Sequence, residues 1–187
     1  MVSVHSCIGT VGLPRDYFDV RYEVLRKPLG SPRGSECLTD DDVALHVWAT
    51  VDGQTVAVGR AALIAGAGEV HDPVGSHCPA FAPLIPSSPK EKDDKGQWVS
   101  DARPALQIRQ MGTLEAYRGT GLAAQVLARL EADAVKLWLC RTGWLQARTS
   151  AIGFYQRCGW VAYGAEYHVD KVGLHRSMWR SFNDPSS

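Results

Sequence analysis

The sequence predicts a fold of the α/β class, in which helices pack on a central sheet. Apolar and polar residues alternate on both sides of Asp52-Gly53, which is typical of a β-hairpin. Further along, residues 121–140 carry apolar side chains at helical spacing, directly after the strand-like segment 105–114. Shorter strand and helix patterns then alternate through residues 144–179. Strands that are joined by helices in this way indicate a sheet with helical cover.

The first elements follow from residues 14–65. Residues 14–26, PRDYFDVRYEVLR, predict a helix, because a proline suited to a first turn precedes apolar and aromatic side chains at helical intervals. Residues 45–65, LHVWATVDGQTVAVGRAALIA, predict the hairpin, since Asp-Gly is favoured in type I′ turns.

Residues 66–103 lack a periodic pattern and include PLIPSSPKEKDDKGQ, whose prolines and charges cannot bury enough apolar surface to order independently. We expect an exposed insertion within a single domain over residues 1–187. His71, His77 and Cys78 fall in this insertion, but no further ligands at metal-site spacing accompany them.

The second half begins with a strand at 105–114, followed by a helix at 121–140 that we expect Gly143 to end. In that helix, one apolar face is predicted, formed by Leu122, Val126, Leu127, Leu130, Ala134, Leu137 and Trp138. The remaining predicted elements are a strand at 144–147, a helix at 150–158 ended by Gly159, and strands at 160–164 and 174–179.

Composition limits the classes of function. The 187 residues are 45% hydrophobic, as in one globular domain, and Lys plus Arg equals Asp plus Glu at 20 each. This balance argues against nucleic-acid binding, which normally needs a basic excess. No export signal and no apolar run of about 18 residues is present, so we expect a cytoplasmic protein that does not bind a membrane. Five scattered cysteines indicate neither a disulfide framework nor a thiolate metal site.

The stretch YRGTGLAAQVLA, residues 117–128, lies where the predicted strand turns into the long helix. Unpaired backbone N–H groups and the helix dipole make such a junction an anion site. Gly119 and Gly121 let the backbone approach a phosphate, Thr120 adds a hydroxyl, and Arg118 adds a charged donor. A pyrophosphate would suit this site.

Three kinds of phosphate site use a glycine turn of this type. A Walker loop needs GxxxxGK[ST], which is absent. A dinucleotide motif, GxGxx(G/A), is met by Gly119, Gly121 and Ala124, and Arg148 could meet a 2′-phosphate. However, a hairpin precedes the motif and only about 40 residues follow the 144–147 strand, whereas that fold continues with parallel βα units.

The third kind rests on two motifs. RGTGLA resembles the (Q/R)xxGx(G/A) acetyl-CoA signature of the GNAT N-acetyltransferase superfamily, with Arg118, Gly121 and Ala123 at the defining positions. About 30 residues later, residues 151–160, AIGFYQRCGW, resemble the family's AxxFYxxxG(F/W). The resemblance implies a mixed central sheet with a splayed parallel pair flanked by helices, and it makes 66–103 an insertion between the hairpin and the central strand.

The resemblance also implies acetyl-CoA as cosubstrate and assigns residues to it. Backbone groups at the end of the central strand would bind the pantetheine arm and polarise the thioester carbonyl, and the turn would hold the pyrophosphate. The residues assigned to the cofactor are Met111, Gly112, Thr113, Arg118, Gly119, Thr120, Gly121, Leu122 and Ala123.

For catalysis, the resemblance makes Tyr155 the acid that protonates the departing thiolate. Glu166 and His175 are candidates for the base that takes a proton from the amine, and His46 is a third. Many relatives place an asparagine where this chain has Arg148, which could instead meet the phosphate or adenine of CoA.

The implied reaction is direct attack of a primary amine on acetyl-CoA, without a metal or a covalent intermediate. Cys140 and Cys158 have no histidine at motif spacing that would activate a cysteine nucleophile. We expect the acceptor to be a small-molecule or peptide amine. The sequence leaves open whether the protein forms a homodimer. Two alternatives remain at this point, an NADP-type oxidoreductase and a non-catalytic sensor that binds acetyl-CoA.

Overall fold

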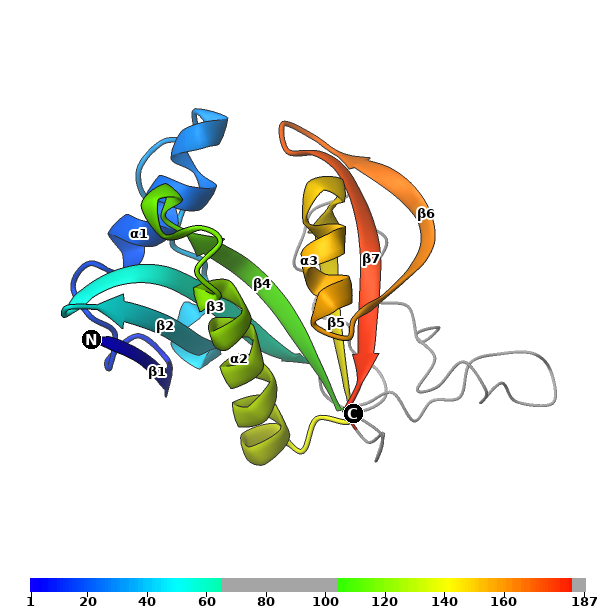
Figure 1. Cartoon of the computed structure of the whole chain (residues 1–187), viewed down its shortest axis with the longest axis horizontal. Helices are drawn as coiled ribbons and strands as arrows, with labels where there is room; N and C mark the ends of the chain where they lie inside the picture. The colour runs from blue at the N-terminus through cyan, green and yellow to red at the C-terminus, as the bar shows by residue number, and fades with distance from the viewer. Residues whose placement is uncertain (65–103, 183–187) are drawn as a thin grey trace, which may run out of the picture. The chain divides into compact units, whose positions relative to one another are not determined.

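A computed structural model describes residues 1–64 and 104–182 (Figure 1). The described residues form two compact units: Met1–Ala62 with Ile108–Ala134 make the first, and the rest make the second. The predicted insertion at 66–103 lies outside the described residues. The expectation of a single domain over the whole chain stays a prediction.

The described strands form one seven-stranded sheet in the order β1-β2-β3-β4-β5-β7-β6, with one parallel pair. Antiparallel pairing joins β1 to β2, β2 to β3, β5 to β7 and β6 to β7. This mixed sheet confirms the predicted α/β class and contradicts a doubly wound parallel dinucleotide fold. The strands are β1 Val2–Ile8, β2 Leu45–Val51, β3 Gln54–Ile64, β4 Ala105–Thr113, β5 Thr142–Arg148, β6 Val161–Val169 and β7 Gly173–Ser181.

The helices begin and end close to the predicted positions. They are α1 Tyr17–Leu25, α2 Leu122–Trp138 and α3 Ile152–Arg157. Short 3-10 turns occupy Lys27–Leu29, Asp41–Val43, Glu115–Tyr117 and Thr149–Ala151. Within its described residues the chain has no helix with the length and hydropathy that a membrane span requires.

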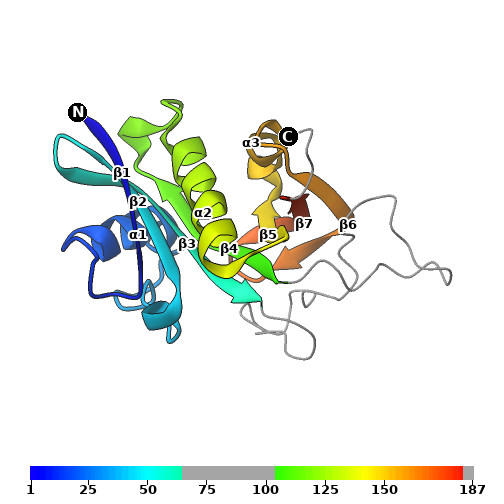
Figure 2. The same cartoon turned by 90° about the horizontal axis from the view of Figure 1, so that it is seen from below.

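In the first unit, α1 and α2 lie on opposite faces of β2 and β3 (Figure 2). Side chains of β2 and β3 pack with α1 in a cluster formed by Tyr17, Val20, Trp48 and Val58. Gly59 faces the other way, since a Cβ there would lie 2.7 Å from Val126 Cγ1 on α2. Because successive side chains of a strand point to opposite faces, the same two strands contact α1 on one face and α2 on the other.

The hairpin turn is confirmed in detail. Asp52 and Gly53 both have positive φ, at 49° and 84°. A type I′ turn requires this conformation at both central residues, which is why Asp-Gly is favoured there.

The role predicted for Gly143, as the residue that ends α2, was wrong. The helix stops at Trp138, where Leu139 takes φ 54°, and Leu137 is 52% exposed instead of lying on the buried face. Gly143 lies inside β5, where a Cβ would come within 2.6 Å of Trp160 and 2.8 Å of Phe182. Only glycine leaves room for these two aromatic rings to pack against the strand. The residues next to Gly143 in the sequence give no sign of this contact.

Strand β1 had no counterpart in the sequence prediction. It pairs along β2 from Val2 to Ile8 and is half exposed as an edge strand. Its residues, VSVHSCI, alternate only weakly between apolar and polar, because neither face is fully buried.

A buried ionic cluster in the first unit was also not predicted. Asp41 Oδ1 accepts hydrogen bonds from Arg60 Nε at 2.7 Å and from Arg21 Nη1 at 3.1 Å, and both arginines are 0% exposed. Asp41 Oδ2 accepts a hydrogen bond from the Leu38 backbone N–H at 2.7 Å. Arg60 also pairs with Asp40. One carboxylate therefore holds α1, β3 and the segment before β2 together.

Candidate active site

The turn between β4 and α2 has the geometry of an anion site. Gly119 and Gly121 take φ 77° and 84°, and a Cβ on either would meet no atom within 4 Å. The glycines are therefore needed for backbone conformation and leave the turn open. Because α2 begins at Leu122, the N–H groups of its first turn have no acceptor within the helix. Their positive dipole end suits a phosphate.

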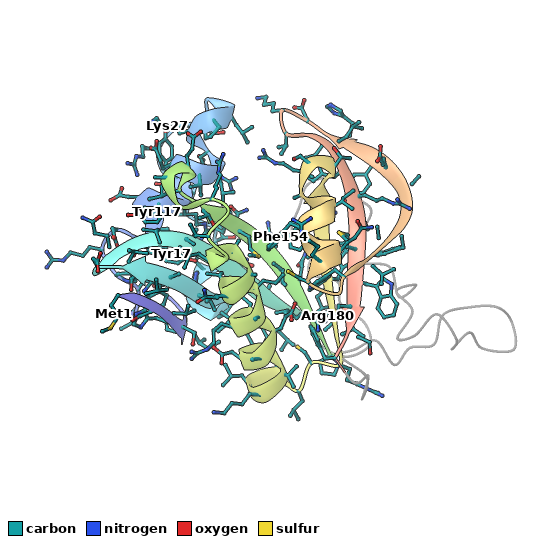
Figure 3. The ribbon with its side chains drawn as sticks, in the orientation of Figure 1. Met1, Tyr17, Lys27, Tyr117, Phe154 and Arg180 are labelled. Atoms are coloured by element: carbon teal, nitrogen blue, oxygen red, sulfur yellow. The ribbon has the colours of Figure 1, made fainter. Side chains whose placement is uncertain are left out.

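Side chains in this turn hold its shape. The Thr120 hydroxyl donates to the Tyr117 carbonyl oxygen at 2.6 Å, and Tyr117 lies in the segment that leads into α2 (Figure 3). The hydroxyl proton is thus used inside the turn, and only the lone pairs of Thr120 remain available. The exposed Arg118 makes a long bond of 3.4 Å from Nε to the Thr113 carbonyl oxygen. Such a weak bond leaves the guanidinium able to turn toward a ligand.

The end of β4 carries the residues predicted to contact the thioester. Met111, Gly112 and Thr113 are all partly buried there. A Cβ at Gly112 would lie 2.4 Å from Val24 Cγ2, so α1 packs directly against this strand end. Just before it, Gln110 has φ 55°, which is rare for a residue other than glycine. Strained backbone of this kind gathers at functional sites, and sequence periodicity gives no sign of it.

In the second unit, Tyr155 lies on α3 with its ring edge-on to Phe154, at 4.9 Å between centroids, and to Trp160, at 6.3 Å. Figure 3 labels Phe154 on the same helix. Burial raises the pKa of Tyr155 well above its ordinary range, and Cys158 adds to the effect. The phenol is therefore protonated at neutral pH, as a general acid must be.

His175 lies on β7 opposite Arg148 on β5, and it is 7% exposed. Its Nδ1 is 2.8 Å from the Gly173 carbonyl oxygen. Because a carbonyl only accepts, Nδ1 carries the proton, and in the neutral ring Nε2 has the free lone pair. Burial lowers the pKa of His175, and the charge of Arg148 lowers it further. The ring is therefore neutral at pH 7 and able to accept a proton.

The other two candidate bases have different surroundings. Glu166 is exposed on β6, inside an irregularity of the β6–β7 pairing between Tyr163 and Tyr167. His46 is 0% exposed, with Nδ1 3.1 Å from the Tyr17 hydroxyl and Nε2 2.8 Å from the Asp41 carbonyl oxygen. Since both ring nitrogens of His46 have partners inside the core, the structure gives this residue a packing role.

The predicted site residues fall into two groups. The structure brings together the cofactor residues, which run from Met111 to Ala123 in the first unit. Tyr155, Glu166 and His175 belong to the second unit. The role of each in binding or catalysis stays a prediction.

Comparison with known proteins gives the family. A profile of the Acetyltransferase (GNAT) family matches residues 13–160. A search of curated proteins finds no match.

Solved structures with the same fold include several acyltransferases. An acyl-CoA N-acyltransferase from Pseudomonas aeruginosa is 22% identical, with 97% of this chain and 100% of that chain covered and a TM-score of 0.62. Escherichia coli ElaA is 17% identical with the same coverage and TM-score. A GNAT family acetyltransferase from Elizabethkingia anophelis, solved with acetyl-CoA bound, is 12% identical over 97% of this chain and 98% of that chain, with a TM-score of 0.53.

The family profile spans the hairpin, β4, the glycine turn with α2, and α3 with its aromatic pair. These are the elements on which both sequence motifs lie. The chain therefore belongs to the GNAT acetyltransferase family.

Proposed function

We propose that the protein transfers an acetyl group from acetyl-CoA to a primary amine. The observation that carries the proposal is the open turn of Gly119 and Gly121 at the start of α2, next to Arg118, in a chain of this family. Backbone amides there suit the pyrophosphate of CoA, and the end of β4 would hold the thioester.

In the proposed reaction the amine nitrogen attacks the thioester carbonyl carbon. A C–N bond forms, the C–S bond breaks, and the sulfur leaves as a thiolate. Tyr155 donates its proton to that sulfur. A tyrosine with a raised pKa is a weak acid, but a desolvated thiolate is also more basic than its usual pKa of about 8.5 implies. A site that also desolvates the sulfur would keep this transfer feasible.

The proton lost by the attacking amine goes to His175 Nε2 in our proposal. His175 has a free lone pair on a neutral, buried ring, whereas Glu166 is exposed on an irregular strand. A base that is held by a backbone hydrogen bond keeps one tautomer and one orientation. Glu166 is the second candidate.

The choice of base predicts a pH dependence. Because the pKa of His175 is lowered, its neutral form persists below pH 6.5 and is lost only at more acidic pH. The turnover number kcat should therefore fall only as the pH drops through this lowered value, and His175→Gln should lower kcat by about 100-fold and remove this acidic limb. Glu166→Gln is the matched control and should leave kcat within about threefold. The reverse result would make Glu166 the base.

Cofactor choice is tested by thermal unfolding of the full chain with acetyl-CoA, CoA, NADP or ATP. Acetyl-CoA at 100 times its Kd should stabilise the protein by about 2.7 kcal/mol, and NADP should not. Arg118→Ala should weaken acetyl-CoA binding by about 10- to 100-fold, the range for a lost charge-assisted hydrogen bond. Arg129→Ala is the control. Arg129 lies on α2 and pairs with Asp133, so its removal should leave acetyl-CoA binding unchanged. A shift with NADP and none with either CoA species would contradict the proposal.

A further inference from the structure

Two glutamines of the second unit lie on one face of the sheet. Ala105 of β4 and Trp144 of β5 belong to one buried cluster, and these two strands are neighbours in the sheet. Because the side chains of a strand alternate between its faces, Gln107 and Gln146, each two positions further on, lie on the same face as this cluster. All four residues belong to the second unit. We call Gln107 and Gln146 the glutamine pair.

The glutamine pair has unmet hydrogen-bonding capacity of opposite kinds. Within residues 1–64 and 104–182, Gln107 Oε1 and Gln146 Nε2 are buried and have no hydrogen-bond partner. Gln107 as a whole is 1% exposed. One glutamine thus lacks a donor and the other lacks an acceptor, and buried polar groups in this state lower the stability of a protein.

The hydroxyl next to the glutamine pair is already satisfied by the chain. Ser177 lies opposite Gln146 on β7, and its hydroxyl interacts with Tyr163 and lies 3.5 Å from the Tyr167 hydroxyl. The fold therefore satisfies Ser177 internally and leaves the two glutamines unsatisfied, as expected of groups that a ligand completes.

The chemistry of the glutamine pair defines its ligand. A group that satisfies both members has to accept a hydrogen bond from Gln146 Nε2 and donate one to Gln107 Oε1. A carboxylate can only accept and would face the Gln107 oxygen, while an ammonium can only donate and would face the Gln146 N–H group. An amide does both, because its C=O accepts and its N–H donates, and it carries no charge that would be costly to bury.

The glutamine pair lies next to the proposed base. Gln146 is opposite Ser177, and His175 is two positions from Ser177 on the same strand and the same face. Such diagonal neighbours lie about 7–8 Å apart across two strands. Gln146 as a whole is partly exposed, so a ligand can approach the pair from its side. An acceptor whose amide binds the pair could therefore place an amine, a few bonds away, at His175 Nε2.

We propose that Gln107 and Gln146 bind an amide group of the amine acceptor, so that the natural substrates are amines with an amide a few bonds away, such as amino acid amides or the N-termini of peptides. This inference rests on the proposed acetyl transfer and names its substrate class. Gln146 donates to the amide C=O, and Gln107 accepts from the amide N–H. Two hydrogen bonds of opposite direction fix the orientation of the amide and therefore the side on which the amine lies.

The experiment compares three acceptors that share one side chain, with the full chain and acetyl-CoA. They are an amino acid amide, the methyl ester of the same amino acid and an alkylamine of the same length. Release of the CoA thiol gives kcat/KM for each, at equal concentrations of the unprotonated amine. We expect the amide to exceed the ester, which lacks the N–H, by at least about tenfold in several such sets, and the alkylamine to react most slowly.

A dipeptide amide in each set distinguishes the two sources of the amide. It should exceed the amino acid amide if peptides are the substrates, and fall below it if small molecules are. Either order supports the inference, provided that both exceed the ester.

Variants of the glutamine pair should change this preference in different ways. Gln107→Met removes the acceptor for the N–H and should lower kcat/KM for the amide about tenfold, while the ester stays within about threefold. Gln146→Met removes the donor to the C=O and should lower amide and ester alike, about tenfold, with the alkylamine unchanged. A merely structural role would lower all three acceptors together. Gln54→Met, exposed at the start of β3, is the matched control and should change none of them.

A second measurement needs no turnover. Because Gln107→Met replaces an unsatisfied buried group by an apolar one of similar size, it should leave the urea midpoint of the free protein unchanged or raise it. With CoA present, the amide should raise the unfolding temperature of the wild type more than the ester does, and Gln107→Met should abolish the difference.

Three results would overturn this inference. They are equal rates with the amide and the ester, equal loss of all three acceptors in Gln107→Met, and a lower urea midpoint of Gln107→Met without a change of preference, which would indicate an internal water bound to the glutamine. Transfer to amines without an amide would still support the proposed function, whereas failure of acetyl-CoA to bind would contradict that function itself.

Discussion

Asp41→Ala should lower the free energy of unfolding by about 3–5 kcal/mol, the usual cost of removing one partner from a buried ion pair. The Asp41 side chain is 5% exposed, and its Oδ1 is shared by two arginines that are fully buried. Without it, both guanidinium groups would stay buried without the carboxylate that they share. Urea unfolding followed by tryptophan fluorescence measures the change.

Asp42→Ala is the matched control for this prediction. Asp42 is the next residue and is exposed, and its Oδ1 accepts a hydrogen bond from the Thr10 hydroxyl at 2.6 Å at the surface. Its removal should cost less than about 1 kcal/mol. If the two variants lose stability equally, the cluster around Asp41 does not hold the first unit together.

Tyr155→Phe should lower kcat by about 100-fold or more, because a positioned general acid contributes at least that much. The ring stays, so its contacts with Phe154 and Trp160 should persist and the affinity for acetyl-CoA should change little. Steady-state kinetics and calorimetric titration with acetyl-CoA separate the two effects.

Tyr163→Phe controls for the loss of any buried hydroxyl in the second unit. Burial raises the pKa of Tyr163 as well, and this residue has no role in the proposed reaction. The Tyr163→Phe variant should therefore keep kcat within about threefold of the wild-type value. A large loss of acetyl-CoA binding in Tyr155→Phe, with kcat unchanged, would remove Tyr155 from its role as the acid.

The conformation of the glycine turn before α2 and that of the hairpin could be predicted because their signals are local. Asp52-Gly53 and the glycines of residues 119–121 act through their own backbone conformation, and the apolar spacing of α2 follows from one helix face. Such features need no knowledge of distant residues. The order of these elements was enough to indicate the fold and, with the two motifs, the family.

The Asp41 cluster and the role of Gly143 could not be predicted, because their causes lie far away in the sequence. Asp41 meets Arg21 and Arg60 from about 20 residues on either side, and charged residues in a sequence are usually exposed. Glycine is required at position 143 because the rings of Trp160 and Phe182 pack against it.

Acetyl transfer itself is tested most directly by mass spectrometry of an amine panel after incubation with acetyl-CoA and the full chain. The account predicts an N-acetylated product, formed in proportion to the CoA released and absent without enzyme. Tight binding of acetyl-CoA with no acetylated amine, in a panel that includes acceptors with and without a carboxylate, would contradict it and indicate a protein that senses acetyl-CoA.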